Sequence, residues 1–136
     1  MIWSQFSISL IFMLIASFSS IGLAELRSGK AVYETSNEKG MKLTERALKN
    51  IEVKTTKATG STQHSLSKES LVYFQDEIGV YRLRENWFKL VKIQVIKKGL
   101  SEVTIRSSEL QNGDEIAIHG ADLLRVSEMD AFGSGE

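Results

Sequence analysis

The chain has 136 residues, and its seventeen Lys or Arg balance seventeen Asp or Glu, so the formal net charge is zero. This balance argues against a nucleic-acid-binding protein, because phosphate binding requires a clustered basic excess. The absence of cysteine excludes disulfide bonds, thiol chemistry and a lipid anchor on cysteine. A chain of this size without disulfides has enough residues for one compact domain and not for two.

The first 24 residues, Met1–Ala24, differ from the rest because they contain no charged side chain. An apolar run, Ser7–Ser17, precedes Ile21-Gly22-Leu23-Ala24, which has small residues at the two positions that a signal peptidase reads. We therefore expect a signal peptide that is cleaved after Ala24, and export to the periplasm. An uncleaved inner-membrane anchor is the alternative, because Phe6–Ala24 has about the length of a membrane-spanning helix.

Residues 25–42 are polar and weakly patterned, with a short strand expected at Lys30–Glu34 and a loop at Ser36–Gly40. A short helix is predicted next, over Leu43–Asn50, because Thr44 is a good N-cap and Glu45 favours the positive end of the helix dipole. The β-branched, alternating residues of Ile51–Ala58 then predict a strand. Thr59–Ser65 has no periodicity and is expected to be a flexible joint.

The chain from Ser67 onward has the pattern of consecutive short strands. Asn112-Gly113-Asp114 is predicted to be a turn, followed by a strand at Glu115–His119 and one helical turn at Ala121–Arg125 that buries Leu123 and Leu124. The acidic tail, residues 127–136, is expected to be frayed. The other expected strands are Leu71–Gln75, Ile78–Arg84, Trp87–Lys97 and Glu102–Arg106, with Val91, Ile93, Val95, Val103 and Ile105 facing the core. The predicted fold is mainly β, a small antiparallel barrel or sandwich with one or two short helices.

No combination of residues predicts a metal site, a cofactor site or a catalytic site. His64 and His119 are expected to be solvated or at a sheet edge, because no ligand spacing such as HxH accompanies them. Met41 and Met129 are too far apart in sequence to suggest a copper site. Ser61, His64 and Ser65 lack the strand-turn-helix arrangement of a nucleophile and base. We therefore expect a protein that is not an enzyme.

The candidates for a partner-docking site are aromatic and basic residues around two hairpins. Exposed aromatic side chains anchor many protein interfaces, whereas buried ones serve core packing. Lysines on a strand face are usually solvated, and at a sheet edge they prevent unwanted strand pairing. The predicted docking residues are Tyr81, Trp87, Phe88, Lys89 and Lys92.

Residues 66–125 resemble the membrane-proximal domain of periplasmic adaptor subunits, or membrane fusion proteins, of resistance-nodulation-division (RND) efflux pumps. The matching segments are LSKESLVYFQDEIGVYRL, WFKLVKIQVIKKGL and LQNGDEIAIHGADLL. Ser67 stands where the family often has proline, and Ser70 where it often has alanine. Upstream, LTERALKNIEVKTTKA is similar to the helix and strand by which many adaptors enter this domain, with Glu52 in place of the usual glycine.

In full-length adaptors, the barrel, lipoyl and helical-hairpin domains separate these two pieces. The resemblance therefore implies one membrane-proximal domain, residues 43–126, whose halves 43–58 and 66–126 are joined directly by residues 59–65. It also implies a non-enzymatic role in transmembrane transport, docking on the inner-membrane transporter or on a full-length adaptor. The alternative is a free periplasmic module that binds a small ligand or a metal at a barrel mouth. A remnant without activity is a third possibility.

Overall fold

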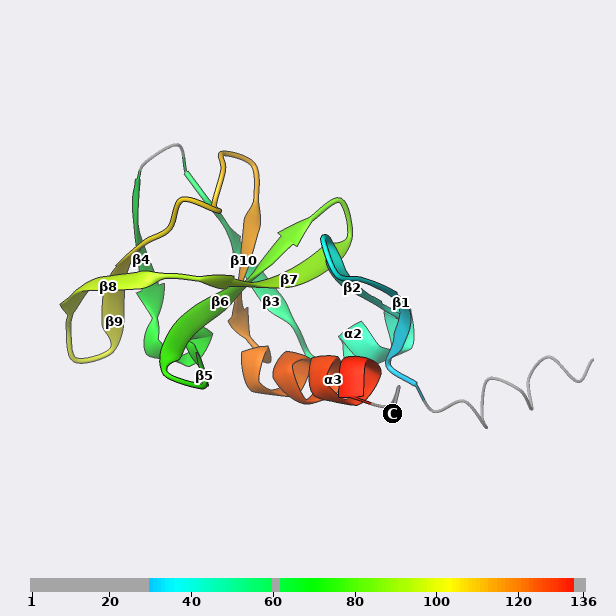
Figure 1. Ribbon diagram of the computed structural model, residues 1–136. Coiled ribbons are helices and arrows are strands. Elements are labelled where there is room, and N and C mark those ends of the chain that lie inside the picture. The colour runs from blue at the N-terminus through cyan, green and yellow to red at the C-terminus, as the bar shows by residue number, and fades with distance from the viewer. Residues whose placement is uncertain (1–29, 60–61, 134–136) are drawn as a thin grey trace, which may run out of the picture.

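Ten β-strands form two antiparallel sheets within residues 30–59 and 62–133, the part of the chain that the computed structural model describes (Figure 1). The expected signal peptide, Met1–Ala24, lies outside the described residues. Seven strands form the larger sheet, in the order β1-β2-β7-β6-β10-β3 with β5 paired to β6, and β4-β9-β8 form the smaller one. The strands are β1 (Val32–Ser36), β2 (Gly40–Leu43), β3 (Lys54–Lys57), β4 (Gln63–Ser67), β5 (Val72–Phe74), β6 (Glu77–Arg84), β7 (Trp87–Lys92), β8 (Gln94–Lys98), β9 (Glu102–Arg106) and β10 (Glu115–His119).

The predicted mainly-β class is confirmed. The larger sheet does not close on itself, so the arrangement is sandwich-like and not a barrel. Two α-helices, α2 (Glu45–Ile51) and α3 (Ala121–Gly133), and one 3-10 turn, η1 (Lys68–Ser70), complete the described fold.

The hairpin of β1 and β2 corrects the prediction for residues 25–42. Residues 32–42 are not a polar segment outside the domain: Val32 and Met41 are buried in the core. The loop expected at Ser36–Gly40 is present as a turn at residues 37–39, but strand β2, which follows it, was not predicted. Gly40 has φ 105°, and a Cβ there would lie 2.0 Å from the carbonyl oxygen of Phe88. Glycine therefore allows β2 to approach β7 closely.

Helix α2 begins as predicted, because the Thr44 side chain accepts a hydrogen bond from the Ala47 N–H at 3.1 Å. It ends later than the expected Asn50. Glu52, in the left-handed region at φ 56°, is the C-cap, and its N–H bonds to the carbonyls of Leu48 and Lys49. Strand β3 consequently starts at Lys54 and not at Ile51.

The joint between the two halves is shorter than predicted. Residues 63–65 of the expected flexible segment 59–65 belong to β4, which pairs with β9 over its full length. Residues 60 and 61 lie outside the described part of the chain. Strand β3, which precedes the joint, pairs with β10 near the end of the chain, so both halves contribute to one sheet.

The predicted long strand Trp87–Lys97 is divided at Ile93. Its first part, β7, lies in the larger sheet, and its second part, β8, lies in the smaller one, so this segment connects the two sheets. Val91 and Ile93 are buried and Val95 is partly buried, as the alternation predicted. The preceding turn has Glu85 and Asn86 at φ 51° and 66°, the geometry that suits a two-residue hairpin.

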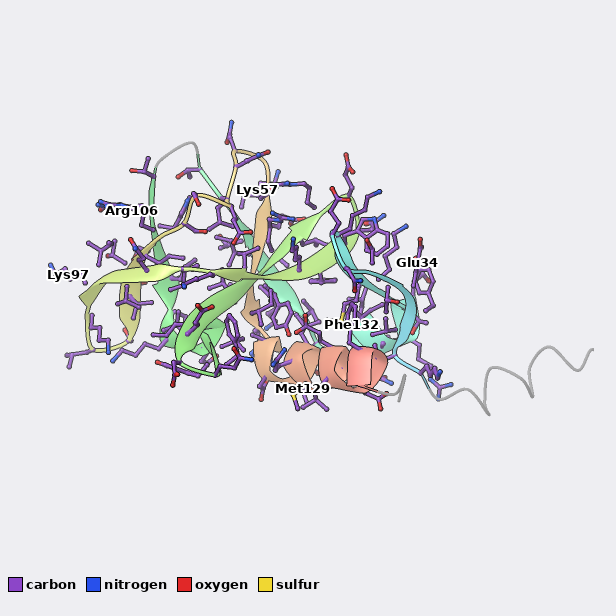
Figure 2. The ribbon with its side chains drawn as sticks, in the orientation of Figure 1. Glu34, Lys57, Lys97, Arg106, Met129 and Phe132 are labelled. Atoms are coloured by element: carbon purple, nitrogen blue, oxygen red, sulfur yellow. The ribbon has the colours of Figure 1, made fainter. Side chains whose placement is uncertain are left out.

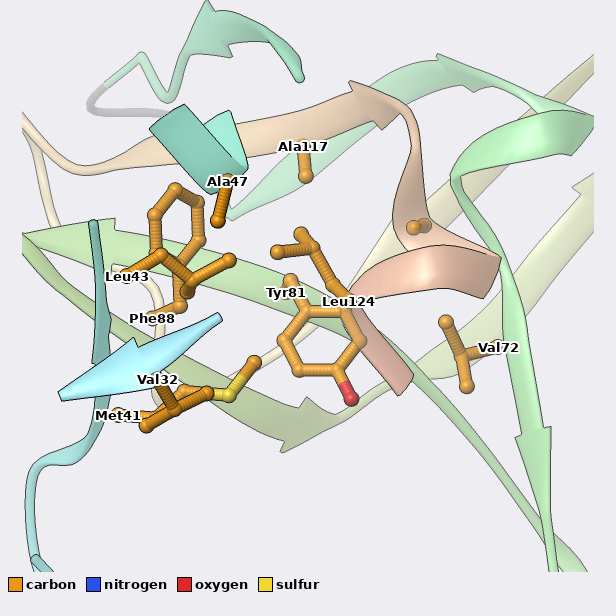
Figure 3. Close-up of a cluster of buried hydrophobic side chains, with 10 residues drawn as sticks. Val32, Met41, Leu43, Ala47, Val72, Tyr81, Phe88, Ala117 and Leu124 are labelled. Atoms are coloured by element: carbon orange, nitrogen blue, oxygen red, sulfur yellow. The ribbon is translucent and has the colours of Figure 1, made fainter. Parts of the chain in front are cut away.

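Two hydrophobic clusters fill the opposite faces of the larger sheet. Adjacent residues of β10 point into different clusters, Ile116 into one and Ala117 into the other. The helix-side cluster, shown in Figure 3, consists of Val32, Met41, Leu43, Ala47, Val72, Tyr81, Phe88, Ala117, Ala121 and Leu124. The strand-side cluster, between the two sheets, consists of Ala58, Leu66, Val80, Val91, Ile93, Val103, Ile105 and Ile116.

Helix α3 replaces the predicted single turn and frayed tail. It has 13 residues and continues to Gly133, so residues 127–133 are helical, while residues 134–136 lie outside the described part. The helix lies along the larger sheet (Figure 1). Leu124 is fully buried as predicted, but Leu123 is 46% exposed, which corrects the expectation that both leucines pack inward.

Candidate docking surface

The five predicted docking residues do not form one exposed surface. Tyr81 and Phe88 are buried in the helix-side cluster, so their prediction as docking residues was wrong. Both side chains point from adjacent strands to the face that α2 and α3 cover. Trp87, Lys89 and Lys92 reach the surface.

Each of these three surface residues already has an intramolecular partner. The Lys42 ammonium lies 4.6 Å from the centroid of the Trp87 ring, close enough for a cation–π interaction. The Lys89 ammonium donates a hydrogen bond to the carbonyl oxygen of Glu38 at 2.7 Å. Lys92 forms an ion pair with Glu77 on the neighbouring strand.

A polar network attaches α3 to the larger sheet. The Tyr81 hydroxyl donates to Oε2 of Glu128 at 2.6 Å, and Arg125 donates to the same oxygen at 2.8 Å. Burial and the hydrogen bond to the Glu128 carboxylate raise the pKa of Tyr81 well above the usual value for a tyrosine. Tyr81 therefore remains a hydrogen-bond donor, and its role is to position α3.

A groove runs between α3 and the adjoining strands. It has a volume of about 520 Å³, and apolar atoms make up most of its lining. Met129 and Phe132 supply one wall from α3, and Lys89 and Leu90 contribute from β7. The remaining lining residues are Ser36, Asn37, Gly40, Arg125, Glu128 and Gly133.

Helix α3 carries four large, partly exposed apolar side chains at intervals of three residues. Figure 2 shows two of them, Met129 and Phe132, on the helix. We call the set the exposed α3 face: Leu123, Val126, Met129 and Phe132 are 46%, 62%, 59% and 42% exposed. An α-helix has about 3.6 residues per turn, so each step of three residues falls short of a full turn and the four side chains wind part-way around α3. Leu123 and Phe132 therefore project to different sides of the helix, and Val126 and Met129 lead from one toward Phe132 and the groove. The three-residue spacing in the sequence could have revealed these side chains, but residues 127–136 were predicted to be a frayed tail and not part of a helix.

Asp114 does more than the predicted turn. It accepts a hydrogen bond from the Gln111 N–H at 2.8 Å, as turn chemistry requires, but its carboxylate is also buried and receives two hydrogen bonds of 2.7 Å from Arg84. The hydrogen bond from Arg84 is the main reason why the pKa of Asp114 lies below its ordinary value. This pair joins β6 to the turn before β10. Its polar atoms already have partners, which favours a structural role.

The histidines do not come together. His64 is buried on β4, which is an edge strand of the smaller sheet. Of the two environments predicted for the histidines, the sheet edge is therefore right for His64 and the solvated one is wrong. His119 is exposed, and its Nδ1 lies 3.8 Å from Glu69. Met41 is in the core whereas Met129 is on the exposed α3 face. Within the described residues, no group of three or more His, Cys, Asp or Glu could hold a metal ion.

Comparisons with family models, with curated proteins and with solved structures found no significant match to this chain. Among the helices of residues 30–59 and 62–133, none has both the length and the apolar character needed to cross a membrane.

Proposed function

We propose that this protein is a non-enzymatic, efflux-adaptor-like protein of the periplasm that docks on an RND-type transporter or on its full-length adaptor. The observation that carries the proposal is the pairing of β3 with β10. These strands belong to the two segments, 43–58 and 66–126, that resemble separated parts of an adaptor's membrane-proximal domain.

The contacts between the two halves extend beyond the backbone pairing. Thr55 Oγ1 on β3 donates a hydrogen bond of 2.9 Å to Glu115 on β10. Ala58, at the end of the first half, is buried in the strand-side cluster, and Ala47 is buried in the helix-side cluster. Direct fusion of the halves is thus compatible with a complete core, which supports an adaptor-like domain that lacks the intervening domains.

The apolar groove beside α3 and the exposed α3 face supply a surface on which a partner can dock. Contiguous exposed apolar side chains are typical of interaction sites, whereas scattered ones have no special meaning. A docking protein needs such a surface, and this one spans several turns of a helix.

The alternative function, binding of a small ligand or metal, was based on the mouth of a barrel. The larger sheet is open, so a small ligand would bind in a surface cavity such as the groove of about 520 Å³ and not in a barrel mouth. Thermal unfolding against a panel of metals and efflux substrates tests this alternative, because a ligand that binds only the native state raises the Tm.

The proposed function is tested by affinity purification of the tagged protein from chemically crosslinked cell envelopes, with mass spectrometry of the captured proteins. We expect an RND transporter or an adaptor subunit among them, enriched over a tagged exported protein of similar size. Repeated capture without any transporter or adaptor component would contradict the proposal.

A further inference from the structure

The exposed α3 face is the largest cluster of exposed apolar side chains in the described part of the chain. Four of the eight large exposed hydrophobic residues belong to it. Tyr33 and Tyr73, which are also exposed, lie on β1 and β5, two strands that α3 contacts. Burying such a face against a partner removes apolar area from water, which favours association.

Acidic residues flank the middle of this face. Asp122 lies one helical turn before Val126, and Asp130 lies one turn after it, so both carboxylates border the central apolar side chain. The one basic residue of α3, Arg125, is paired with Glu128 at 2.8 Å. The exposed α3 face therefore combines apolar contacts with two negative charges.

These charges disfavour two of the surfaces that could cover the face. An anionic lipid surface attracts basic side chains and repels carboxylates. A second copy of the chain is also disfavoured, because a two-fold antiparallel pair centred on Val126 would place Asp122 of one copy against Asp130 of the other. Like charges so placed are repulsive.

We infer that the exposed α3 face docks an amphipathic helix of a protein partner, whose apolar side chains are flanked by Lys or Arg. The partner's apolar residues cover Val126 and Met129 and enter the groove beside Phe132, and its basic residues face Asp122 and Asp130. An apolar helix face in a groove is a common mode of peptide recognition. The inference rests on the proposed function only in that the protein acts by docking, and it does not require that the partner be an RND transporter.

The size of the face predicts a weak complex. Stable interfaces bury about 1,200–2,000 Å² in total, and four half-exposed side chains with one groove contribute less. We therefore expect micromolar affinity for an isolated helix, and tighter binding when other contacts of a whole partner are added.

The test measures binding of two labelled amphipathic peptides to the purified protein by fluorescence anisotropy. One peptide has leucines on one helix face flanked by lysines, and the other has glutamates in place of the lysines. We expect the lysine peptide to bind about tenfold more tightly than the glutamate peptide. Equal binding of the two, or no binding of either, would overturn the inference.

Substitutions separate the apolar and the electrostatic contributions. Val126→Ser with Met129→Ser should weaken the lysine peptide about tenfold, whereas the matched control Leu100→Ser, at a fully exposed leucine in the turn after β8, should not. Asp122→Lys with Asp130→Lys should reverse the preference toward the glutamate peptide. Circular dichroism verifies that each variant remains folded.

Two further measurements examine whether a lipid surface or a second copy of the chain covers the exposed α3 face instead. Flotation with phosphatidylglycerol vesicles, and sedimentation of the protein alone, should show neither lipid binding nor dimers that depend on Val126. Lipid binding through this face, or dimers that depend on Val126, would overturn the inference. If the lysine peptide binds as expected but no transporter or adaptor is captured from envelopes, the proposed function fails and the docking face stands.

Discussion

The helix-side and strand-side clusters differ in how they are closed. Side chains from strands and their flanking segments supply the strand-side cluster, which lies between two sheets. The helix-side cluster is closed by α2 and α3, and each helix depends on a polar contact. The Thr44 side chain caps the start of α2, and the Tyr81 hydroxyl donates a hydrogen bond to Glu128 of α3. We infer that the first cluster stabilises the fold by apolar packing between the sheets, and that the second also positions the exposed α3 face.

The largest effect is expected for Ile116→Ala in the strand-side cluster. Ile116 is fully buried on β10, so the substitution should lower the free energy of unfolding by about 2–5 kcal/mol, a large part of the total for a small domain. Urea denaturation measures the loss. Ile96→Ala, at a residue 44% exposed on β8, is the control and should change stability by less than about 0.5 kcal/mol. Equal losses in both variants would show that this cluster is not the stabilising core.

A smaller effect is expected for Asp114→Asn, which removes the charge that pairs with Arg84. We expect a loss of about 1–3 kcal/mol at neutral pH, limited because the Arg84 side chain is a third exposed.

The depressed pKa of Asp114 also predicts a pH dependence of stability. A lowered folded-state pKa contributes stability above the unfolded value, about 3.9, and this contribution is lost as pH falls through the folded-state pKa. Urea denaturation across the acidic range should therefore show the wild type and Asp114→Asn converging at low pH. Parallel profiles would contradict the role of the pair.

Tyr81→Phe is expected to act mainly on α3. The variant keeps the apolar ring but removes the hydrogen bond to Glu128, which retains Arg125, so we expect a loss of about 1–2 kcal/mol. Hydrogen exchange should accelerate in α3 more than in β9. Tyr73→Phe, at an exposed tyrosine, should leave exchange unchanged. Uniform acceleration throughout the sheets would indicate a general role in stability.

The raised pKa of Tyr81 gives a second readout. A raised folded-state pKa contributes stability that is fully present below the unfolded value, about 10, and that is lost as pH rises through the folded-state pKa. The alkaline fall in stability should therefore be smaller in Tyr81→Phe than in the wild type.

The smallest effect is expected for Thr44→Ala. Loss of the N-cap bond to the Ala47 N–H should cost about 1 kcal/mol and increase exchange at the start of α2. Thr35→Ala on β1 is the control, because Thr35 is exposed. If Thr44→Ala left hydrogen exchange in α2 unchanged, packing alone would determine where the helix begins.

The strand-side cluster could be predicted from the sequence because its residues alternate with polar ones. Val91, Ile93, Val103 and Ile105 were predicted to face the core, and all four are buried. Alternation of this kind is local information, so it requires no knowledge of which strand is the neighbour.

The helix-side cluster could not be predicted in the same way. The β1–β2 hairpin buries only a few residues within a polar stretch, and α3 turns a carboxylate, Glu128, toward the sheet. The partner of Glu128 is Tyr81, 47 residues earlier, and no local pattern indicates such a pair. For the same reason, Tyr81 and Phe88 were predicted to be docking residues, because only the position of the helices shows that they are covered.

Site-specific photocrosslinking in cells examines the proposed function and the docking face together, namely that a transporter or adaptor subunit docks on the exposed α3 face. A photoreactive amino acid replaces Val126 on this face, and Leu100 in the β8–β9 turn is the exposed control position. We expect a crosslink from position 126, absent from position 100, to a transporter or adaptor subunit identified by mass spectrometry. The same products from both positions, or no transporter or adaptor component from position 126, would contradict it.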